Sequence, residues 1–190
     1  MFGIQSSLAA TRTNIRAISR FVGTISNKLL LLSQADAGRL NLHREPFDLS
    51  KALADLVEDT RMLAPHLQVT SEISPNLTIS VDRSLLRQVL HNLISNAIKY
   101  NVDRGWIRIS TLVSPKKIEV LVVNSSPGIP IFECDKIFDR FYRTDFARSG
   151  HVEGVGLGLS VSREIARAHG GDITLRADHD GTVQFLLLPS

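Results

Sequence analysis

The stretch that most constrains the fold is a predicted helix from Asp82 to Tyr100. Asp82 is a good N-cap, because its carboxylate can accept hydrogen bonds from the free N–H groups of the first turn. Apolar residues then recur at helical spacing and make one continuous face: Leu85, Leu86, Val89, Leu90, Leu93, Ile94, Ala97 and Ile98. A helix with such a face packs against a core, so we expect the rest of the chain to cover it.

A second stripe of the same helix is polar. Asn92, Asn96 and Lys99 stand at positions i, i+4 and i+7 and therefore share a face. Amide oxygens are hard ligands that suit magnesium, and a lysine ammonium is a point charge for phosphate. The stripe alone also fits ordinary polar residues on a half-buried helix, so the segments downstream decide between the two interpretations.

A cluster of small and apolar residues opens another predicted helix, 157–169: Gly154, Gly156, Leu157, Gly158 and Leu159. Glycines let backbone N–H groups approach phosphate oxygens, and a helix N-terminus adds a favourable dipole. No clear strand precedes the cluster, which argues against the dinucleotide fingerprint, and the Walker pattern ending in Gly-Lys-Ser/Thr is absent. The polar segment 144–153, just before the cluster, is predicted to be a lid.

Composition narrows the possible functions. The formal net charge is +3 and no basic run contains interleaved aromatic residues, so no nucleic-acid partner is expected. Cys134 is the only cysteine, which excludes internal disulfides and cysteine-built metal sites and fits a reducing compartment. No apolar run is long enough to span a membrane and no signal-peptide pattern is present, so membrane attachment is expected only through missing N-terminal parts.

The N-terminal part carries a heptad pattern, in which apolar residues follow a 3-4 spacing: Leu8, Ile15, Ile18, Val22, Ile25, Leu29 and Leu32. We interpret residues 5–35 as one long helix, with Gly38 as its C-terminal stop. A long, narrow apolar seam is typical of a coiled coil, so a homodimer through this helix is predicted. Packing of the helix on its own domain is the alternative.

The order of the remaining predicted elements indicates the fold class. Helices are expected at 48–65, 82–100 and 157–169, and strands at 40–44, 67–73, 77–81, 106–113, 118–123, 173–177 and 183–188. Strands and helices do not alternate strictly, so the class is α+β. We expect an α/β sandwich with a mixed, mostly antiparallel sheet covered by helices, preceded by one long coiled-coil-like helix.

In this order, the segments of residues 46–189 resemble the catalytic ATP-binding domain of sensor histidine kinases, which has the Bergerat fold. The matching motifs are the asparagine box at 92–100, glycine boxes at 127–130 and 154–159, the phenylalanine box at 138–141, and a last box at 181–182. The resemblance implies two domains. Residues 43–190 would be the catalytic ATP-binding domain, and residues 1–42 the second helix of a dimerisation and phosphotransfer hairpin plus a linker.

The resemblance also implies a site for ATP and Mg²⁺. Asn96 would ligand the metal with Asn92 beside it, and Lys99 and the lid arginines would hold phosphates. The full predicted ATP-binding set is Asn92, Asn96, Lys99, Tyr100, Asn124, Gly128, Ile129, Arg140, Arg143, Gly154, Gly156, Leu157, Gly158, Leu159 and Thr182. The family usually has Asp where Asn124 stands, to accept from the adenine amino group. Asn124 can still accept through its amide oxygen.

The function implied is that of a protein histidine kinase in the cytoplasmic part of an inner-membrane sensor. It would pass the γ-phosphoryl group of ATP to a histidine for relay to the receiver domain of a response regulator. The first hairpin helix, which carries the phosphoacceptor histidine, is absent from the sequence, so no catalytic residue is assigned and the chain alone is not expected to phosphorylate itself. The alternatives are a non-enzymatic nucleotide-binding regulatory module and a hydrolytic relative, which Asn92 disfavours because an amide is a poor base.

Overall fold

The computed structural model describes residues 19, 21–126, 128–144, 154–178 and 181–189. The elements follow one another in the order β1 (Arg44–Asp48), α2 (Leu49–Leu63), β2 (Gln68–Glu72), β3 (Thr78–Asp82), α3 (Arg83–Lys99), β4 (Trp106–Ser114), β5 (Lys117–Asn124), η1 (Ile131–Glu133), η2 (Lys136–Phe138), α4 (Gly158–Ala168), β6 (Asp172–Asp178) and β7 (Gly181–Pro189). They are preceded by a helix whose continuously described part is 21–36, called here the N-terminal helix.

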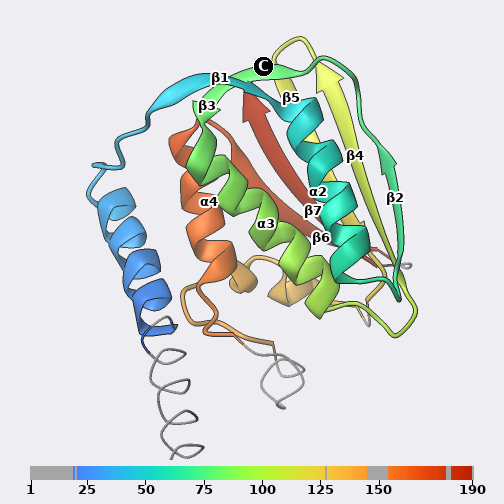
Figure 1. Cartoon of the computed structure of the whole chain (residues 1–190). Coiled ribbons are helices and arrows are strands. Elements are labelled where there is room, and N and C mark those ends of the chain that lie inside the picture. The colour runs from blue at the N-terminus through green and yellow to red at the C-terminus, as the bar shows by residue number, and fades with distance from the viewer. Residues whose placement is uncertain (1–18, 20, 127, 145–153, 179–180, 190) are drawn as a thin grey trace, which may run out of the picture.

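The strands form a five-stranded sheet with the order β2-β4-β5-β7-β6, while β1 and β3 pair separately. The β2–β4 pair is parallel, and the other three pairs of the large sheet are antiparallel. Helices α2, α3 and α4 lie together over one face of this sheet, with α3 in the middle (Figure 1). This arrangement confirms the predicted α/β sandwich with a mixed, mostly antiparallel sheet.

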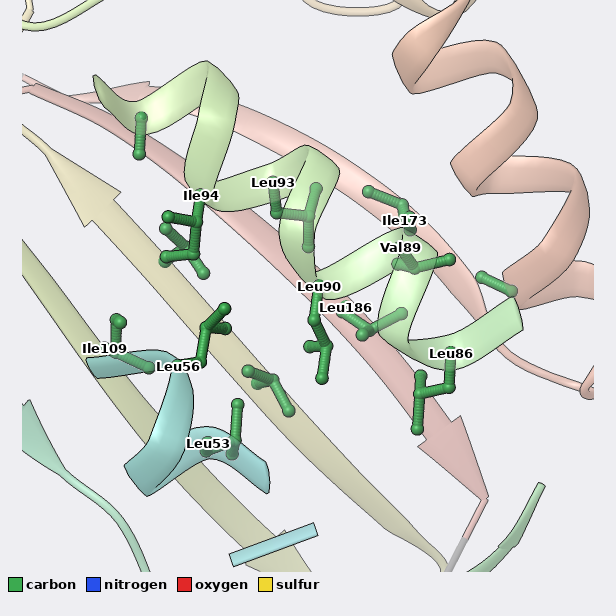
Figure 2. Packing of buried hydrophobic residues seen from close by; sticks show 14 of the residues in the cluster. Leu53, Leu56, Leu86, Val89, Leu90, Leu93, Ile94, Ile109, Ile173 and Leu186 are labelled. Carbon is green, nitrogen blue, oxygen red and sulfur yellow. The ribbon is translucent and has the colours of Figure 1, made fainter. Parts of the chain in front are cut away.

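Helix α3 is the centre of the core, as its sequence predicts. Its buried residues are Leu86, Val89, Leu90, Leu93, Ile94 and Ala97. Figure 2 shows this side of α3 lying against Leu53 and Leu56 of α2 and against Ile109, Ile173 and Leu186 of the sheet. The predicted N-cap is confirmed, because Asp82 Oδ1 accepts from the N–H groups of Ser84 and Leu85, each at 3.1 Å. The apolar face of α3 is thus used for the core, and the polar stripe with Asn92, Asn96 and Lys99 is left for other contacts.

The first strand is not where the sequence pattern placed it. A strand was expected at 40–44, but β1 occupies Arg44–Asp48. The pairing register sets Phe47 opposite Ile79 of β3, and Phe47 is only 5% exposed. Burial of one aromatic side chain against a distant strand outweighs the local alternation of residues 40–44. Asp48 still caps α2 as predicted, since its Oδ1 accepts from the N–H of Lys51 at 2.9 Å.

The N-terminal helix packs on the same chain, which was the alternative weighed for it. Leu32 is 1% exposed and belongs to the core, and Ile25 is partly buried against it. Val22 and Leu29 remain 54% and 41% exposed. The heptad seam is therefore divided between a side that faces the domain and a side that faces outward. The predicted helical residues 5–18 and 20 lie outside the described residues.

Candidate nucleotide-binding site

A cavity of about 450 Å³ opens beside the polar stripe of α3. Its walls come from the N-terminal helix, the second half of α3, the end of β5 with the turn that follows, the segment 142–144, the segment 154–159, and β6 and β7. All predicted site residues except Arg140 line it. They are Asn92, Asn96, Lys99, Tyr100, Asn124, Gly128, Ile129, Arg143, Gly154, Gly156, Leu157, Gly158, Leu159 and Thr182.

The start of α4 is held directly against α3. A Cβ atom on Gly158 would lie 2.5 Å from Asn92 Oδ1, so only glycine permits this approach without displacing the asparagine. The Nδ2 of Asn92 in turn donates to Ser162 Oγ at 3.0 Å. Gly156 has φ +76° and a Cβ on it would meet the carbonyl oxygen of Tyr142 at 2.6 Å. Gly156 and Gly158 are therefore required by close packing around the cavity.

The N-terminus of α4 is suited to an anion. Among the described residues no side chain caps it, whereas Asp48 and Asp82 cap α2 and α3. Within that part of the chain the first-turn N–H groups of α4 lack the usual side-chain acceptor, and the residues around this end line the cavity. An uncapped helix end presents free donors and a partial positive charge. This end of the cavity fits phosphate oxygens.

The opposite wall of the cavity is formed by buried amide and hydroxyl groups. Asn124 and Thr182 are cross-strand partners on β5 and β7, and they are 2% and 5% exposed. Thr182 Oγ1 shares a hydrogen bond of 2.7 Å with Ser126 Oγ. The Nδ2 of Asn124 donates to the carbonyl oxygen of Ser125 at 2.9 Å, so its amide oxygen is left as the acceptor. Fixed polar groups on an otherwise apolar wall suit the edge of a flat base.

Positive charge gathers at the rim of the cavity near the end of α3. Lys99 and Arg143 both line it. Burial raises the pKa of the Tyr100 hydroxyl, while the neighbouring Arg143 guanidinium acts in the opposite direction. Tyr100 therefore stays protonated near neutral pH and can donate a hydrogen bond. Two cations and a phenol on one side form an environment for a negatively charged ligand.

Arg140 lies elsewhere, although the sequence grouped it with the phosphate-binding residues. Its Nη2 is 2.5 Å from Oδ1 of Asp36, at the end of the N-terminal helix. It lines a second hollow, of about 420 Å³, between that helix and α4. The backbone direction here is set by Phe141, which has φ +63°. This turn conformation separates Arg140 from Arg143.

Several lining residues were not predicted from the sequence: Phe21, Thr24, Ile25, Lys28, Ser126, Pro130, Glu133, Ile137, Tyr142, Thr144, Val155, Leu175 and Gln184. Gln184 could have been found, because it shares the inward face of β7 with Thr182, Leu186 and Leu188 and is, with Thr182, a polar residue in that otherwise apolar row. The residues of the N-terminal helix carry no such signal. The predicted lid, apart from Thr144, lies outside the described residues.

His169 lies at the C-terminal end of α4 and links this helix to α3. It is 1% exposed, its Nε2 accepts from the N–H of Asp82 at 2.9 Å, and its Nδ1 lies 2.8 Å from the carbonyl oxygen of Ile165. This pattern requires a neutral imidazole with the proton on Nδ1. Burial lowers the pKa of His169, so the folded state holds it uncharged. The imidazole ties the end of α4 to the start of α3.

We expect acid to weaken the fold through this histidine. Because its pKa is lower in the folded chain than the unfolded value near 6.5, the unfolded chain binds the extra proton more readily. Stability is complete above pH 6.5 and falls as the pH drops below it. Urea unfolding of wild type between pH 7.5 and 5 should show this slope, and His169→Gln should flatten it. The exposed His66→Gln variant is the control, and equal slopes in all three proteins would contradict the assignment.

Comparison with known proteins agrees with this geometry. Residues 81–190 match the family of histidine kinase-, DNA gyrase B-, and HSP90-like ATPases. The chain belongs to this ATPase family. Sensor protein CutS of Streptomyces coelicolor is 33% identical over 164 residues, which cover 85% of this chain and 39% of CutS. The chain therefore spans well under half the length of this curated relative.

Solved structures place the chain within the histidine kinase branch of the family. The crystal structure of histidine kinase ThkA in complex with the response regulator protein TrrA is 26% identical, with a TM-score of 0.66, and the match covers 92% of this chain and 50% of that one. The ATP-binding domain of PrrB from Mycobacterium tuberculosis is also 26% identical, with a TM-score of 0.63, covering 77% of this chain and 97% of that one.

Proposed function

We propose that this chain is the ATP-binding kinase core of a two-component sensor histidine kinase. It binds ATP with magnesium and passes the γ-phosphoryl group to a histidine on a dimerisation and phosphotransfer hairpin. The observation that carries the proposal is that two elements, α3 and α4, line one cavity. The Asn92, Asn96 and Lys99 stripe of α3 faces the same space as the uncapped N-terminus of α4. Membership of the ATPase family supports the identity of the ligand.

The cavity divides naturally into a base side and a phosphate side. Asn124, Thr182 and the apolar Ile129 form the wall that would hold adenine, with the amide oxygen of Asn124 accepting from its amino group. Lys99, Arg143 and the first turn of α4 would hold the phosphates. The likeness to the ATP-binding domain of PrrB supports ATP as the ligand. Arg140 is left out of the phosphate set because it pairs with Asp36.

Magnesium fits the donor chemistry of α3. Among the described residues, no group of three or more His, Cys, Asp or Glu side chains could hold a metal on its own. Magnesium prefers oxygen ligands and is commonly bound by few protein groups together with substrate phosphates. Asn96 would supply an amide oxygen, and Asn92 lies beside it. When bound, the ion neutralises phosphate charge during transfer.

Phosphoryl transfer of this kind depends on position and charge more than on covalent chemistry by the protein. The chain would hold the γ-phosphate still while an imidazole approaches in line, at about 3–3.5 Å before reaction. The product would pass its phosphoryl group to the receiver domain of a response regulator. ThkA, which resembles this chain, is crystallised with such a regulator, and this supports the choice of partner.

The test is to mix the chain with labelled ATP, magnesium and a separately made phosphotransfer hairpin. Label on the hairpin histidine supports the proposal. Steady release of phosphate without labelled hairpin indicates a hydrolase instead. ATP binding with neither reaction indicates a regulatory nucleotide-binding module, and the kinase proposal then fails.

We further propose that the chain works on the cytoplasmic side of an inner-membrane sensor, as a dimer. Its single cysteine fits a reducing compartment. No helix among the described residues is long and apolar enough to cross a membrane. Val22 and Leu29 form an exposed apolar strip on the N-terminal helix, and a second hairpin helix or a second copy of the chain would cover it.

Charge on this strip should weaken self-association. We expect light scattering to show more than a monomer for wild type and mainly monomer for Val22→Asp with Leu29→Asp, because two carboxylates would be buried in the contact. Asn27→Asp, on an exposed position away from the strip, should leave the mass unchanged. A double variant that associates as strongly as wild type would contradict the proposed interface.

A further inference from the structure

One face of the N-terminal helix forms part of the wall of the nucleotide cavity. Phe21, Thr24, Ile25 and Lys28 all line the cavity. They stand at positions i, i+3, i+4 and i+7 of a described helix and therefore share one side of it. A segment that belongs to a different predicted domain thus reaches the site that the ATP-binding domain was expected to form alone.

Lys28 is the charged residue of this face, and its ammonium group can interact with an anion in the cavity. Lys28 is half-buried, and Asn92, Asn96 and Lys99 line the same cavity. Burial lowers the pKa of the Lys28 ammonium, and the charge of Lys99 lowers it further. Lys99 is thus a like-charged neighbour of Lys28 at the cavity that the first turn of α4 also lines. Two like charges repel each other, and an anion bound in this cavity would reduce that repulsion.

Two contacts farther along the same face hold the helix in place. Leu32, one turn after Lys28, is 1% exposed and reaches the hollow formed with Phe138 and Ser160. Asp36, one turn farther, pairs with Arg140. The ion pair is about half exposed and contributes little, so the buried Leu32 is the main anchor. Figure 1 shows the N-terminal helix running beside α4, whose first turn lies at the cavity.

We propose that the docked N-terminal helix completes the phosphate side of the nucleotide site, with Lys28 as a phosphate-binding cation supplied from outside the ATP-binding domain. The proposal rests on the proposed function, since it assumes a nucleoside triphosphate in the cavity. Its consequence is coupling between two events. A helix held at Leu32 strengthens nucleotide binding, and by linkage the bound nucleotide strengthens the docking of the helix.

The first experiment compares MgATP with adenosine, which lacks phosphates, by calorimetry on the full chain. Lys28→Met keeps an apolar stem and removes the charge. We expect about tenfold weaker binding of MgATP, the size of one charge-assisted contact, and unchanged binding of adenosine. Lys116→Met removes an exposed lysine of the β4–β5 turn and should change neither affinity.

The second experiment weakens the docking of the N-terminal helix and leaves the charge of Lys28 in place. Leu32→Ala should weaken MgATP binding about as much as Lys28→Met, because Lys28 then no longer lies at the cavity. The combined variant should be no weaker than either single variant, since both remove the same contribution. Asp36→Asn, which weakens only the exposed ion pair, should have a smaller effect in the same direction.

Three results would overturn the inference. Wild-type affinity for MgATP in Lys28→Met would show that the lysine does not contact phosphate. Equal losses for MgATP and adenosine would show that the substitution merely deforms the cavity. Independent, additive losses in the combined variant would show that Leu32 and Lys28 do not act together. Absence of MgATP binding in wild type would overturn the proposed function as well, which distinguishes the two failures.

Discussion

Asn96→Ala is expected to lose at least about 100-fold in magnesium-dependent phosphotransfer, because changes even to the groups that support a metal ligand commonly cost 10- to 100-fold. The substitution removes the amide oxygen of the half-buried Asn96 without touching the apolar face of α3. Affinity for adenosine should be unchanged, because the base wall is formed by Asn124 and Thr182. The measurement is initial-rate labelling of the hairpin over a range of magnesium concentrations.

Asn41→Ala, at an exposed position outside the cavity, is the matched control for that result. The free energy of unfolding of Asn96→Ala, from urea titration, should stay close to that of wild type, so that any loss of rate is assigned to the site. Wild-type labelling by Asn96→Ala at low magnesium would remove this residue from the metal site. A parallel loss of adenosine binding would instead indicate a damaged cavity.

Gly181→Ala is expected to destabilise the fold by about 3 kcal/mol, at the upper end of the usual cost of overpacking. An added Cβ would lie 2.1 Å from the carbonyl oxygen of Asn124, which is a backbone atom of the central strand β5. The clash therefore forces β7 away from β5 at the point where Thr182 faces Asn124. Urea unfolding, followed by the fluorescence of the single tryptophan Trp106, measures the loss.

The same substitution at Gly23 should not lower the free energy of unfolding. Among the described residues, no atom lies within 4 Å of a Cβ added there, and Gly23 is inside a helix. Alanine is favoured over glycine in a helix interior by about 1 kcal/mol, so Gly23→Ala should be neutral or slightly stabilising. If Gly181→Ala unfolds at the same urea concentration as wild type, the strands are less closely packed at the cavity wall than the structure indicates.

The parts of the fold that could be predicted are those determined by local sequence. Asp48 and Asp82 mark the starts of α2 and α3 because a cap acts within three residues of itself. The buried side of α3 follows from helical periodicity. The position of β1 could not be predicted, since it depends on Phe47 packing opposite Ile79, far along the chain. The division of the heptad seam also depends on tertiary contacts, because Leu32 is buried by the ATP-binding domain.

The candidate site was predictable to the extent that its residues lie in recognisable motifs. The glycine segment and the asparagine stripe are separated in sequence, and the close approach of Gly158 to Asn92 brings them together. Motifs do not determine the direction of a loop side chain, and so Arg140 points to Asp36 instead of the cavity. Lys28 was missed because a lysine on an amphipathic helix is ordinary until its neighbours are known.

The strand order of the large sheet has a consequence for how the protein folds. Strand β5 is joined to β4 by a tight turn, but its other neighbour in the sheet is β7, which comes after all the other strands in chain order. Pairing of segments this distant is slow to nucleate, because a long loop must close first. While the chain is being synthesised, the edge of β5 stays open until β7 has been made, and an open edge invites pairing with other chains. The cavity wall between Asn124 and Thr182 is therefore among the last parts of the fold to form.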